Sequence, residues 1–187
     1  AVGLGRIASM QRGPANRLAF GYDGWGRASS QTREIADSIG VTATQYDLLG
    51  RATSLTYPNG EVASYEYGQD GAVVRVLFDG NPIVADATYD ALRRPLEIRW
   101  GNGLSTQTQW EASREKVESI LVGNDTSTAL RFSYVYDEGG NTTQMFEDVE
   151  GWSRVFSYDW ADRLVSATHT AGGSTTGAWN WQYDATG

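Results

Sequence analysis

A tyrosine followed by an aspartate recurs along the whole chain, and this repeat constrains the fold more than any other feature. The pairs are Tyr22-Asp23, Tyr46-Asp47, Tyr89-Asp90, Tyr136-Asp137, Tyr158-Asp159 and Tyr183-Asp184. Two degenerate copies fill the gaps, at Tyr67 and at Trp110, where tryptophan and glutamate replace the pair. The eight anchors lie 21 to 26 residues apart, so one unit of roughly 22 residues accounts for the chain of 187 residues.

Each unit has the pattern of a β-hairpin. Aromatic residues alternate before the aspartate, as at Phe20 and Tyr22, which places them on one face of a strand. The aspartate then begins a D-x-x-G turn, because its carboxylate can accept backbone amides and the glycine can adopt a positive φ. The glycine position is held by Gly26, Gly50, Gly71, Gly140 and Gly187. Arg93, Arg114 and Asp162 replace it elsewhere, so those three turns are expected to differ or to carry strain.

A return strand such as "RATSLTY" and a second turn such as "YPNG" complete the unit. Residues 31–40 and 111–120 have weak helical patterns, but they lie in phase with return strands and are expected to be strands. Residues 169–178 are expected to form a long exposed turn, because they are small and polar. The predicted fold is all-β: an array of antiparallel hairpins in a curved, spiralling sheet, since so wide a sheet rarely stays flat.

Both ends of the sequence fall within a unit. "GLGRIA", Gly3 to Ala8, matches a dinucleotide-binding pattern, but Gly5-Arg6 aligns with Gly26-Arg27 of the repeat, and no parallel-sheet pattern surrounds it. We therefore expect residues 1–187 to be a single array of about eight units, excerpted from a longer one. Its two unpaired sheet edges favour edge-to-edge self-association.

The composition excludes several classes of function. The chain has 23 acidic and 15 basic residues, a net charge of −8, which disfavours a nucleic acid partner. It has no cysteine, which removes thiol nucleophiles, disulfides and the common structural zinc sites. No apolar run is long enough to predict a membrane span, and no signal peptide is expected within these residues.

The units resemble the YD-repeat, or rearrangement-hotspot (Rhs), family. The resemblance rests on "YDxxGR" at Tyr22, at Tyr46 and, with Arg93 in place of glycine, at Tyr89, and on "SLTYPNG". It implies a hairpin array that spirals into a hollow shell enclosing a C-terminal toxin, as in bacterial Rhs effectors and insecticidal toxin complexes. Teneurin adhesion receptors carry a similar shell. No Asp-Pro pair occurs, so the family's D-P-x-G self-cleavage region has no counterpart here.

The resemblance further implies a secreted or cell-surface protein, bacterial in origin. Its partners would be an encapsulated polypeptide, a toxin above all, and neighbouring repeats of the parent protein. The function predicted is a non-enzymatic scaffold. The alternative is an adhesion module that binds a glycan or a partner protein through exposed aromatic residues.

We expect no catalytic residue, cofactor or metal site. Successive strand residues point to opposite faces, so Tyr46 and Asp47 are poorly placed to share a substrate. His169 is the only histidine, and without a G-x-S-x-G motif it is expected to be an exposed loop residue. Glu147 and its acidic neighbours lack the spacing of a calcium loop and are expected to form a solvated turn. A hydrolase would require His169 or a pair of the other carboxylates.

Two further residue classes recur in the turns. Four arginines follow the turn and are expected to pair with turn carboxylates: Arg27, Arg51, Arg94 and Arg163. Trp25 and Trp160 fall inside the turn itself. Packing on the adjacent hairpin is the preferred interpretation for both tryptophans, and exposure to a ligand is the alternative.

Overall fold

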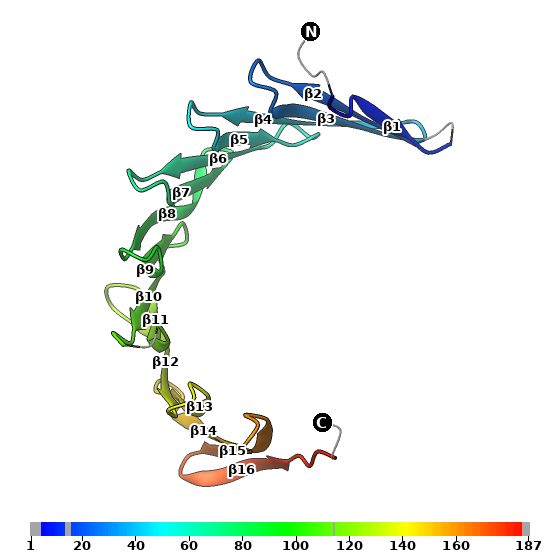
Figure 1. Ribbon diagram of the computed structural model, residues 1–187. Helices are drawn as coiled ribbons and strands as arrows, with labels where there is room; N and C mark the ends of the chain where they lie inside the picture. Colours follow the sequence, from blue (N-terminus) through cyan, green and yellow to red (C-terminus); the bar gives the residue numbers. More distant parts are fainter. Residues whose placement is uncertain (1–4, 14–15, 114, 185–187) are drawn as a thin grey trace. The chain divides into compact units, whose positions relative to one another are not determined.

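The computed structural model describes residues 5–13, 16–113 and 115–184, and within them every regular element is a β-strand (Figure 1). The 16 strands form an antiparallel sheet in which they follow one another in sequence order. The predicted all-β hairpin array is therefore confirmed. The chain divides into two compact units, Ala1–Ala87 and Thr88–Gly187, which are described separately.

The first unit contains the strands β1 to β7 and most of β8. Their bounds are β1 Ser9–Gln11, β2 Asn16–Tyr22, β3 Ala28–Ile35, β4 Ser38–Tyr46, β5 Ala52–Thr56, β6 Val62–Tyr67, β7 Val73–Phe78 and β8 Asn81–Tyr89. The helical alternative for residues 31–40 is excluded, because they form the end of β3, a tight turn and the start of β4.

The second unit contains the end of β8 and eight further strands. Their bounds are β9 Pro95–Trp100, β10 Ser105–Trp110, β11 Val117–Gly123, β12 Thr128–Tyr136, β13 Thr142–Glu147, β14 Trp152–Tyr158, β15 Leu164–Ala171 and β16 Ser174–Asn180. Residues 111–120 are likewise not helical where the structure describes them, since β11 begins at Val117.

The D-x-x-G turns end each hairpin with a type I turn and a bulge. In the second hairpin the amide of Gly50 donates to the carbonyl of Asp47 at 3.1 Å, and the amide of Asp47 donates to the carbonyl of Arg51 at 2.9 Å. Gly50 has a φ of 83°, and the pairing shifts by one residue at Tyr46. A glycine in the left-handed region after a type I turn is what allows the return strand to pair in this register.

Two of the three turns without glycine keep this conformation and carry the strain. Arg93 and Asp162 have φ values of 62° and 58°, a region that side chains with a Cβ adopt at a cost. The third turn is one residue longer, because the amide of Glu111 donates to the carbonyl of Lys116, and its left-handed residue is Glu115 with a φ of 55°. Gly3, Arg114 and Gly187 lie outside the described residues.

The turns at the other edge are of several types. Asp79-Gly80 and Gly172-Gly173 are two-residue turns in which both residues have positive φ, the geometry that suits the twist of a hairpin. The expectation of a long turn over residues 169–178 is therefore wrong. β15 continues to Ala171 and β16 begins at Ser174, because two consecutive glycines reverse the chain without any longer loop.

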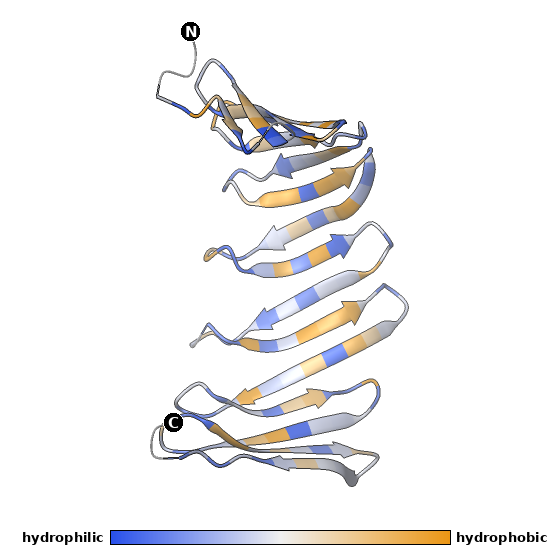
Figure 2. Cartoon of the chain, turned by 90° about the vertical axis from the view of Figure 1, so that its right-hand side faces the viewer, coloured by the Kyte–Doolittle hydropathy of each residue, from blue (hydrophilic) through white to orange (hydrophobic). Residues whose placement is uncertain are grey.

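Each unit is a single layer of sheet. Strands contact only their neighbours in the sheet, and the buried apolar residues within the described segments are alanines, namely Ala63, Ala87 and Ala167. Polar and apolar residues alternate along many strands (Figure 2). The sheet therefore has faces but no closed hydrophobic core, and its stability must come from contacts between adjacent strands.

The two faces of the second unit differ in composition. Phe132, Tyr134 and Trp152 lie on one face, where the rings of Phe132 and Trp152 meet edge to face at a centroid distance of 5.9 Å. Ser153 and its cross-strand partner Thr170 lie on the opposite face. Period-two alternation therefore places these three rings on one face and these two hydroxyl groups on the other, where Phe146 pairs with Ser153.

Candidate functional site

The repeated turn is built around its aspartate side chain. The Oδ1 atom of Asp47 accepts hydrogen bonds from the backbone amides of Leu49 and Arg51, both at 2.9 Å. Its Oδ2 atom accepts the Nε of Arg51 at 2.7 Å. The carboxylate therefore closes the turn and fixes the arginine that starts the return strand.

The same contacts recur in the other turns that keep both residues. Arginine Nε to aspartate Oδ2 distances are 2.6 Å for Arg27-Asp23, 2.6 Å for Arg94-Asp90 and 2.8 Å for Arg163-Asp159. The four arginines thus pair with turn carboxylates, as their recurrence predicts. Each pair lies within one turn rather than between turns.

The guanidinium group of each turn arginine also contacts the next turn. Arg27 lies over the ring of Tyr46 in the next unit, with 4.6 Å from Cζ to the ring centroid, and its Nη1 donates to the carbonyl of Asp47 at 2.8 Å. Arg51 lies over Tyr67 at 4.3 Å, and Arg163 lies over Tyr183 at 4.5 Å. Each arginine therefore joins its own turn to the next one by a cation–π contact.

The hydroxyl group of each motif tyrosine donates a hydrogen bond to a backbone carbonyl of the preceding unit. Tyr46 donates to the carbonyl of Ala28 at 2.8 Å, and Tyr67 donates to the carbonyl of Ala52 at 2.6 Å. Hydroxyl bonds of the same kind join Tyr22 to Ile7, Tyr136 to Val117, Tyr158 to Thr142 and Tyr183 to Leu164. We call these repeated aspartate, arginine and aromatic contacts the turn ladder.

The degenerate copies preserve the ladder by substitution. Trp110 replaces tyrosine, yet its indole Nε1 donates to the carbonyl of Pro95 at 2.9 Å while Arg94 lies over its ring at 4.9 Å. Lys116 replaces arginine over Tyr136 at 5.8 Å. These two substitutions therefore keep a ring with a hydrogen-bond donor and a cation in contact with each other or with their neighbours.

Three members of the ladder depart from the pattern. In the turn after Tyr67, Gly68 and Ala72 hold the positions of the aspartate and the arginine. Asn141 replaces arginine, and its Nδ2 donates to the carboxylate of Asp162 in the next turn at 2.8 Å, so an amide-to-carboxylate hydrogen bond takes the place of the cation–π contact. The Nη1 of Arg94 is buried and has no hydrogen-bond partner among the described residues. The turn that follows Trp110 in the next unit is the longer one, in which the amide of Glu111 donates to the carbonyl of Lys116.

The turn lowers the pKa of its carboxyl group. Burial acts to raise the pKa of Asp47, but the backbone amide of Arg51, the Arg51 side chain and the amide of Leu49 outweigh it. The pKa values of Asp23, Asp90 and Asp159 are lowered by the same balance. For Asp137 the backbone amide of Asn141 is the main cause of the lowering. The aspartates are thus held as anions and are unsuited to act as general bases near neutral pH.

The remaining predicted motif residues have structural places in the array. Tyr89 ends β8 immediately before Asp90, Gly140 has a φ of 86° in its turn, and Asp184 follows β16. No two motif carboxylates converge on a common cavity, because each faces its own turn.

The tips of the turns carry exposed apolar side chains. Trp25 is 79% exposed and Trp160 is 92% exposed, so the expectation that they pack on the adjacent hairpin is wrong. Each lies in the middle of its turn, between the residues whose backbone hydrogen bond closes that turn. Leu48 and Leu49 are 96% and 78% exposed at the tip next to Trp25, a feature not singled out from the sequence.

His169 is not an exposed loop residue, which corrects the expectation. It lies in β15, half-buried, with its Nδ1 2.7 Å from Thr176 Oγ1 and its ring 5.4 Å from that of Trp152. Its hydrogen-bond partner is a β16 hydroxyl and not Ser166 or Ser174, so the geometry is that of a cross-strand contact and not of a nucleophile and base.

Glu147 also differs from its prediction as part of a solvated turn. Its side chain is only 2% exposed and accepts backbone amides of Val149 at 3.1 Å, Glu150 at 2.5 Å and Arg131 at 3.4 Å. Burial acts to raise its pKa, but these amide bonds lower it overall. Glu147 therefore replaces aspartate as the organiser of a turn at the opposite edge. No group of acidic residues or histidine suited to a metal ion occurs in the described segments.

Comparisons of sequence find no match in any protein-family model or any curated protein. Among solved structures, a crystal structure of a TcdB2–TccC3–Cdc42 complex matches 82% of this chain with a TM-score of 0.77 and 21% identity. This chain has the same fold as the segment of that structure that it matches. A Photorhabdus luminescens Tc holotoxin pore structure matches 89% of the chain with a TM-score of 0.67 and 16% identity. The chain spans 9% and 12% of the length of those two chains.

These matches confirm the resemblance to a YD-repeat array at the level of the fold. The matched chains are much longer than this one, and one of them belongs to a Tc holotoxin. No helix in the described segments is long and apolar enough to span a membrane.

Proposed function

We propose that the chain is a stretch of wall in a YD-repeat shell, which sequesters a polypeptide cargo until delivery. The cargo would be a toxin, and the partners would be that cargo and neighbouring repeats of one longer array. The observation that carries the proposal is the structural match to a TcdB2–TccC3–Cdc42 complex over 82% of the chain. The parent protein would be secreted or displayed at the cell surface, in a bacterium.

The turn ladder supports this role physically. A wall of single-layer sheet has no second layer to stabilise it, so each hairpin must be fastened to the next within the sheet itself. The ladder supplies one such fastening per unit at one edge, for example from Arg27 to Tyr46 and from Tyr46 to Ala28. A continuous antiparallel wall satisfies its own backbone hydrogen bonds and can exclude proteases from whatever it encloses. The proposal assigns no catalytic activity, cofactor or metal to the chain.

Limited proteolysis of the complete natural gene product tests the proposal. We expect the region C-terminal to the repeats to resist protease while the array is folded, and to be digested once urea unfolds the array. Digestion at the same rate in both states would contradict the shell. Single-particle imaging of the same preparation, with density inside the repeat wall, is the second readout.

A second candidate function is adhesion through exposed aromatic side chains, and the exposure of Trp25 and Trp160 favours it. A tryptophan ring at a turn tip offers an apolar face to a sugar or a partner protein. We expect a glycan array to report binding that is lost in both Trp25→Ala and Trp160→Ala variants. Trp152→Phe, a change on the sheet face away from the tips, is the matched control. An array without signal would leave the shell as the function.

A further inference from the structure

Two arginines of the first unit stand apart from the turn ladder. The guanidinium groups of Arg12 and Arg33 have no carboxylate or aromatic partner among the described residues, whereas the ladder arginines are all paired. Unpaired guanidinium groups are unexpected in a chain whose net charge is −8. Their surroundings therefore need an explanation.

The strand register places both arginines on one face. Met10 pairs with Leu18, and Leu18 pairs with Arg33, so these three residues form a row across β1, β2 and β3. Arg12 directly follows β1, and its amide donates to the carbonyl of Asn16 at 2.9 Å, so Arg12 continues the pairing with β2 two residues beyond Met10. Period-two alternation then turns Arg12 and Arg33 to the same side of the sheet.

Two adjoining hollows open on this face and share Arg33 and Ile35. One has a volume of about 330 Å³ and the other about 320 Å³. Their other lining residues on this face include Met10, Arg12, Asn16, Gln31, Thr42 and Pro58. Gly40 keeps the second hollow open beside Pro58, since a Cβ at Gly40 would lie 3.2 Å from Pro58 Cγ.

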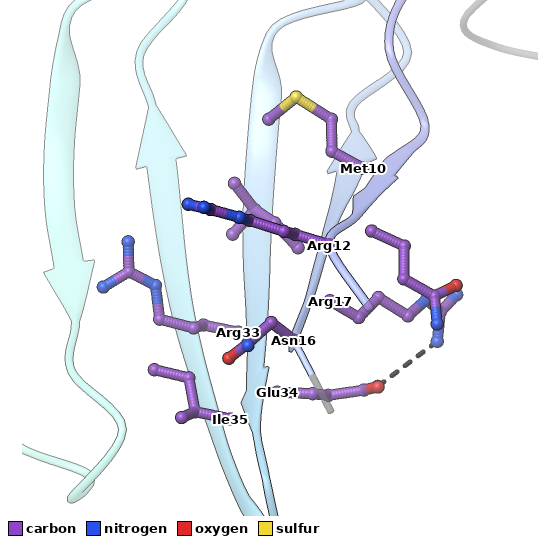
Figure 3. A pocket seen from close by; sticks show the side chains of 9 residues that line it. Met10, Arg12, Asn16, Arg17, Arg33, Glu34 and Ile35 are labelled. Atoms are coloured by element: carbon purple, nitrogen blue, oxygen red, sulfur yellow. Dashed lines mark hydrogen bonds and ion pairs between the residues drawn. The ribbon is translucent and has the colours of Figure 1, made fainter. Parts of the chain in front are cut away.

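The two guanidinium groups extend in the same direction, between Met10 and Ile35, as Figure 3 shows. Glu34 reaches the rim of the first hollow, but it forms an ion pair with Arg17 at 3.2 Å, on the other side of the strands (Figure 3). The hollows therefore combine two uncompensated cations with amide and hydroxyl groups and with apolar walls.

We propose that these hollows bind the carboxylate side chains of an acidic peptide segment. A guanidinium presents a planar fork that matches a carboxylate with two hydrogen bonds. β1 and β3 are separated by one strand, about 10 Å from centre to centre, so two side chains of an extended peptide can each reach one arginine. Met10, Ile35 and Pro58 accept the methylene groups of such side chains. This site is separate from the shell role, and binding can be measured on the chain whatever its parent encloses.

Fluorescence anisotropy with a fluorescein-labelled oligoglutamate peptide tests the proposal. We expect binding that falls about tenfold or more in Arg12→Gln and again in the Arg12→Gln/Arg33→Gln double variant, because each change removes charge-assisted hydrogen bonds. Arg75→Gln is the matched control: it removes the same charge from β7, whose residues line neither hollow, and should change the affinity by no more than about twofold. Circular dichroism spectra identical to that of the natural chain establish that the variants are folded.

Three results would overturn the proposal. The first is no binding of the peptide by the natural chain, and the second is an equal loss in the Arg75→Gln control, which would indicate nonspecific attraction. The third is displacement of the peptide by inorganic phosphate at equal concentration, which would identify a small-anion site instead. Selective loss in the Arg12 and Arg33 variants, without competition by phosphate, supports it.

Discussion

Acidification is expected to destabilise the hairpin array sharply below about pH 4, while stability is nearly constant from about pH 5 to neutrality. The pKa values of Asp23, Asp47, Asp90, Asp137 and Asp159 are lowered in the folded chain, and so is that of Glu147. A lowered carboxyl pKa contributes stability that is present above the unfolded-state value, near 4, and is lost as the pH falls through the folded-state value. Because the same turn recurs, the losses accumulate along the chain.

Urea unfolding followed by tryptophan fluorescence at pH 7 and at pH 2 measures this effect. Asp47→Asn provides the matched comparison, because it removes one turn charge and keeps the shape of the side chain. We expect the variant to unfold at lower urea than the natural chain at pH 7, and the gap between the two midpoints to narrow at pH 2, because protonation of Asp47 removes the charge that the variant lacks. An unchanged gap between the two midpoints would show that the charge of Asp47 contributes nothing to the turn.

The regular part of this fold could be predicted from the sequence because its signals are local. Aspartate and glycine at fixed spacing determine a turn through contacts within five residues, as the amides bound by Asp47 show. Alternating aromatic residues then identify the strands. Residues 31–40 and 111–120 have weak helical patterns, but the period of the repeat predicts a return strand at that point in every unit and correctly excludes a helix.

The errors arose where composition was used in place of geometry. Residues 169–178 are polar and small, which is typical of a loop, but Gly172 and Gly173 both adopt positive φ and make the tightest hairpin turn available. His169 was consequently placed in a loop, although it lies in a strand beside Trp152. The acidic neighbours of Glu147 favour a solvated turn, whereas its carboxylate is buried and accepts hydrogen bonds from the amides of Val149 and Arg131.

Of the contacts in the turn ladder, only those within one turn could be predicted from the sequence. The pairing of Arg51 with Asp47 is local and follows from their spacing. The position of Arg51 over Tyr67 and the bond from Tyr67 to Ala52 join residues of different units, so they depend on the register of three strands. A usable signal does exist: the cation, the ring and the turn recur together, and Trp110 retains a ring with a donor where tyrosine is lost.

The coupling between Arg51 and Tyr67 is expected to be among the strongest single links in the first unit. Their contact is the closest of the cation–π contacts, at 4.3 Å, and the hydroxyl of Tyr67 also donates to Ala52 at 2.6 Å. Tyr67→Leu should therefore lower the free energy of unfolding by about 2 kcal/mol, through loss of the ring contact and of a hydrogen bond. Arg51→Met should cost a comparable amount, because it also removes the partner of Asp47.

A double-mutant cycle isolates the link between units. Arg51→Met combined with Tyr67→Leu should cost about 0.5 to 2 kcal/mol less than the sum of the two single changes, which is the size of a partly desolvated cation–π contact. Tyr65→Leu is the matched control: Tyr65 lies two residues earlier on the same strand and face, and its effect should add to that of Arg51→Met. Additivity for both tyrosines would mean that hairpins are joined by backbone pairing alone. Coupling confined to Tyr67 would show that the turn ladder stabilises neighbouring hairpins of a single-layer sheet against unfolding, beyond what backbone pairing provides.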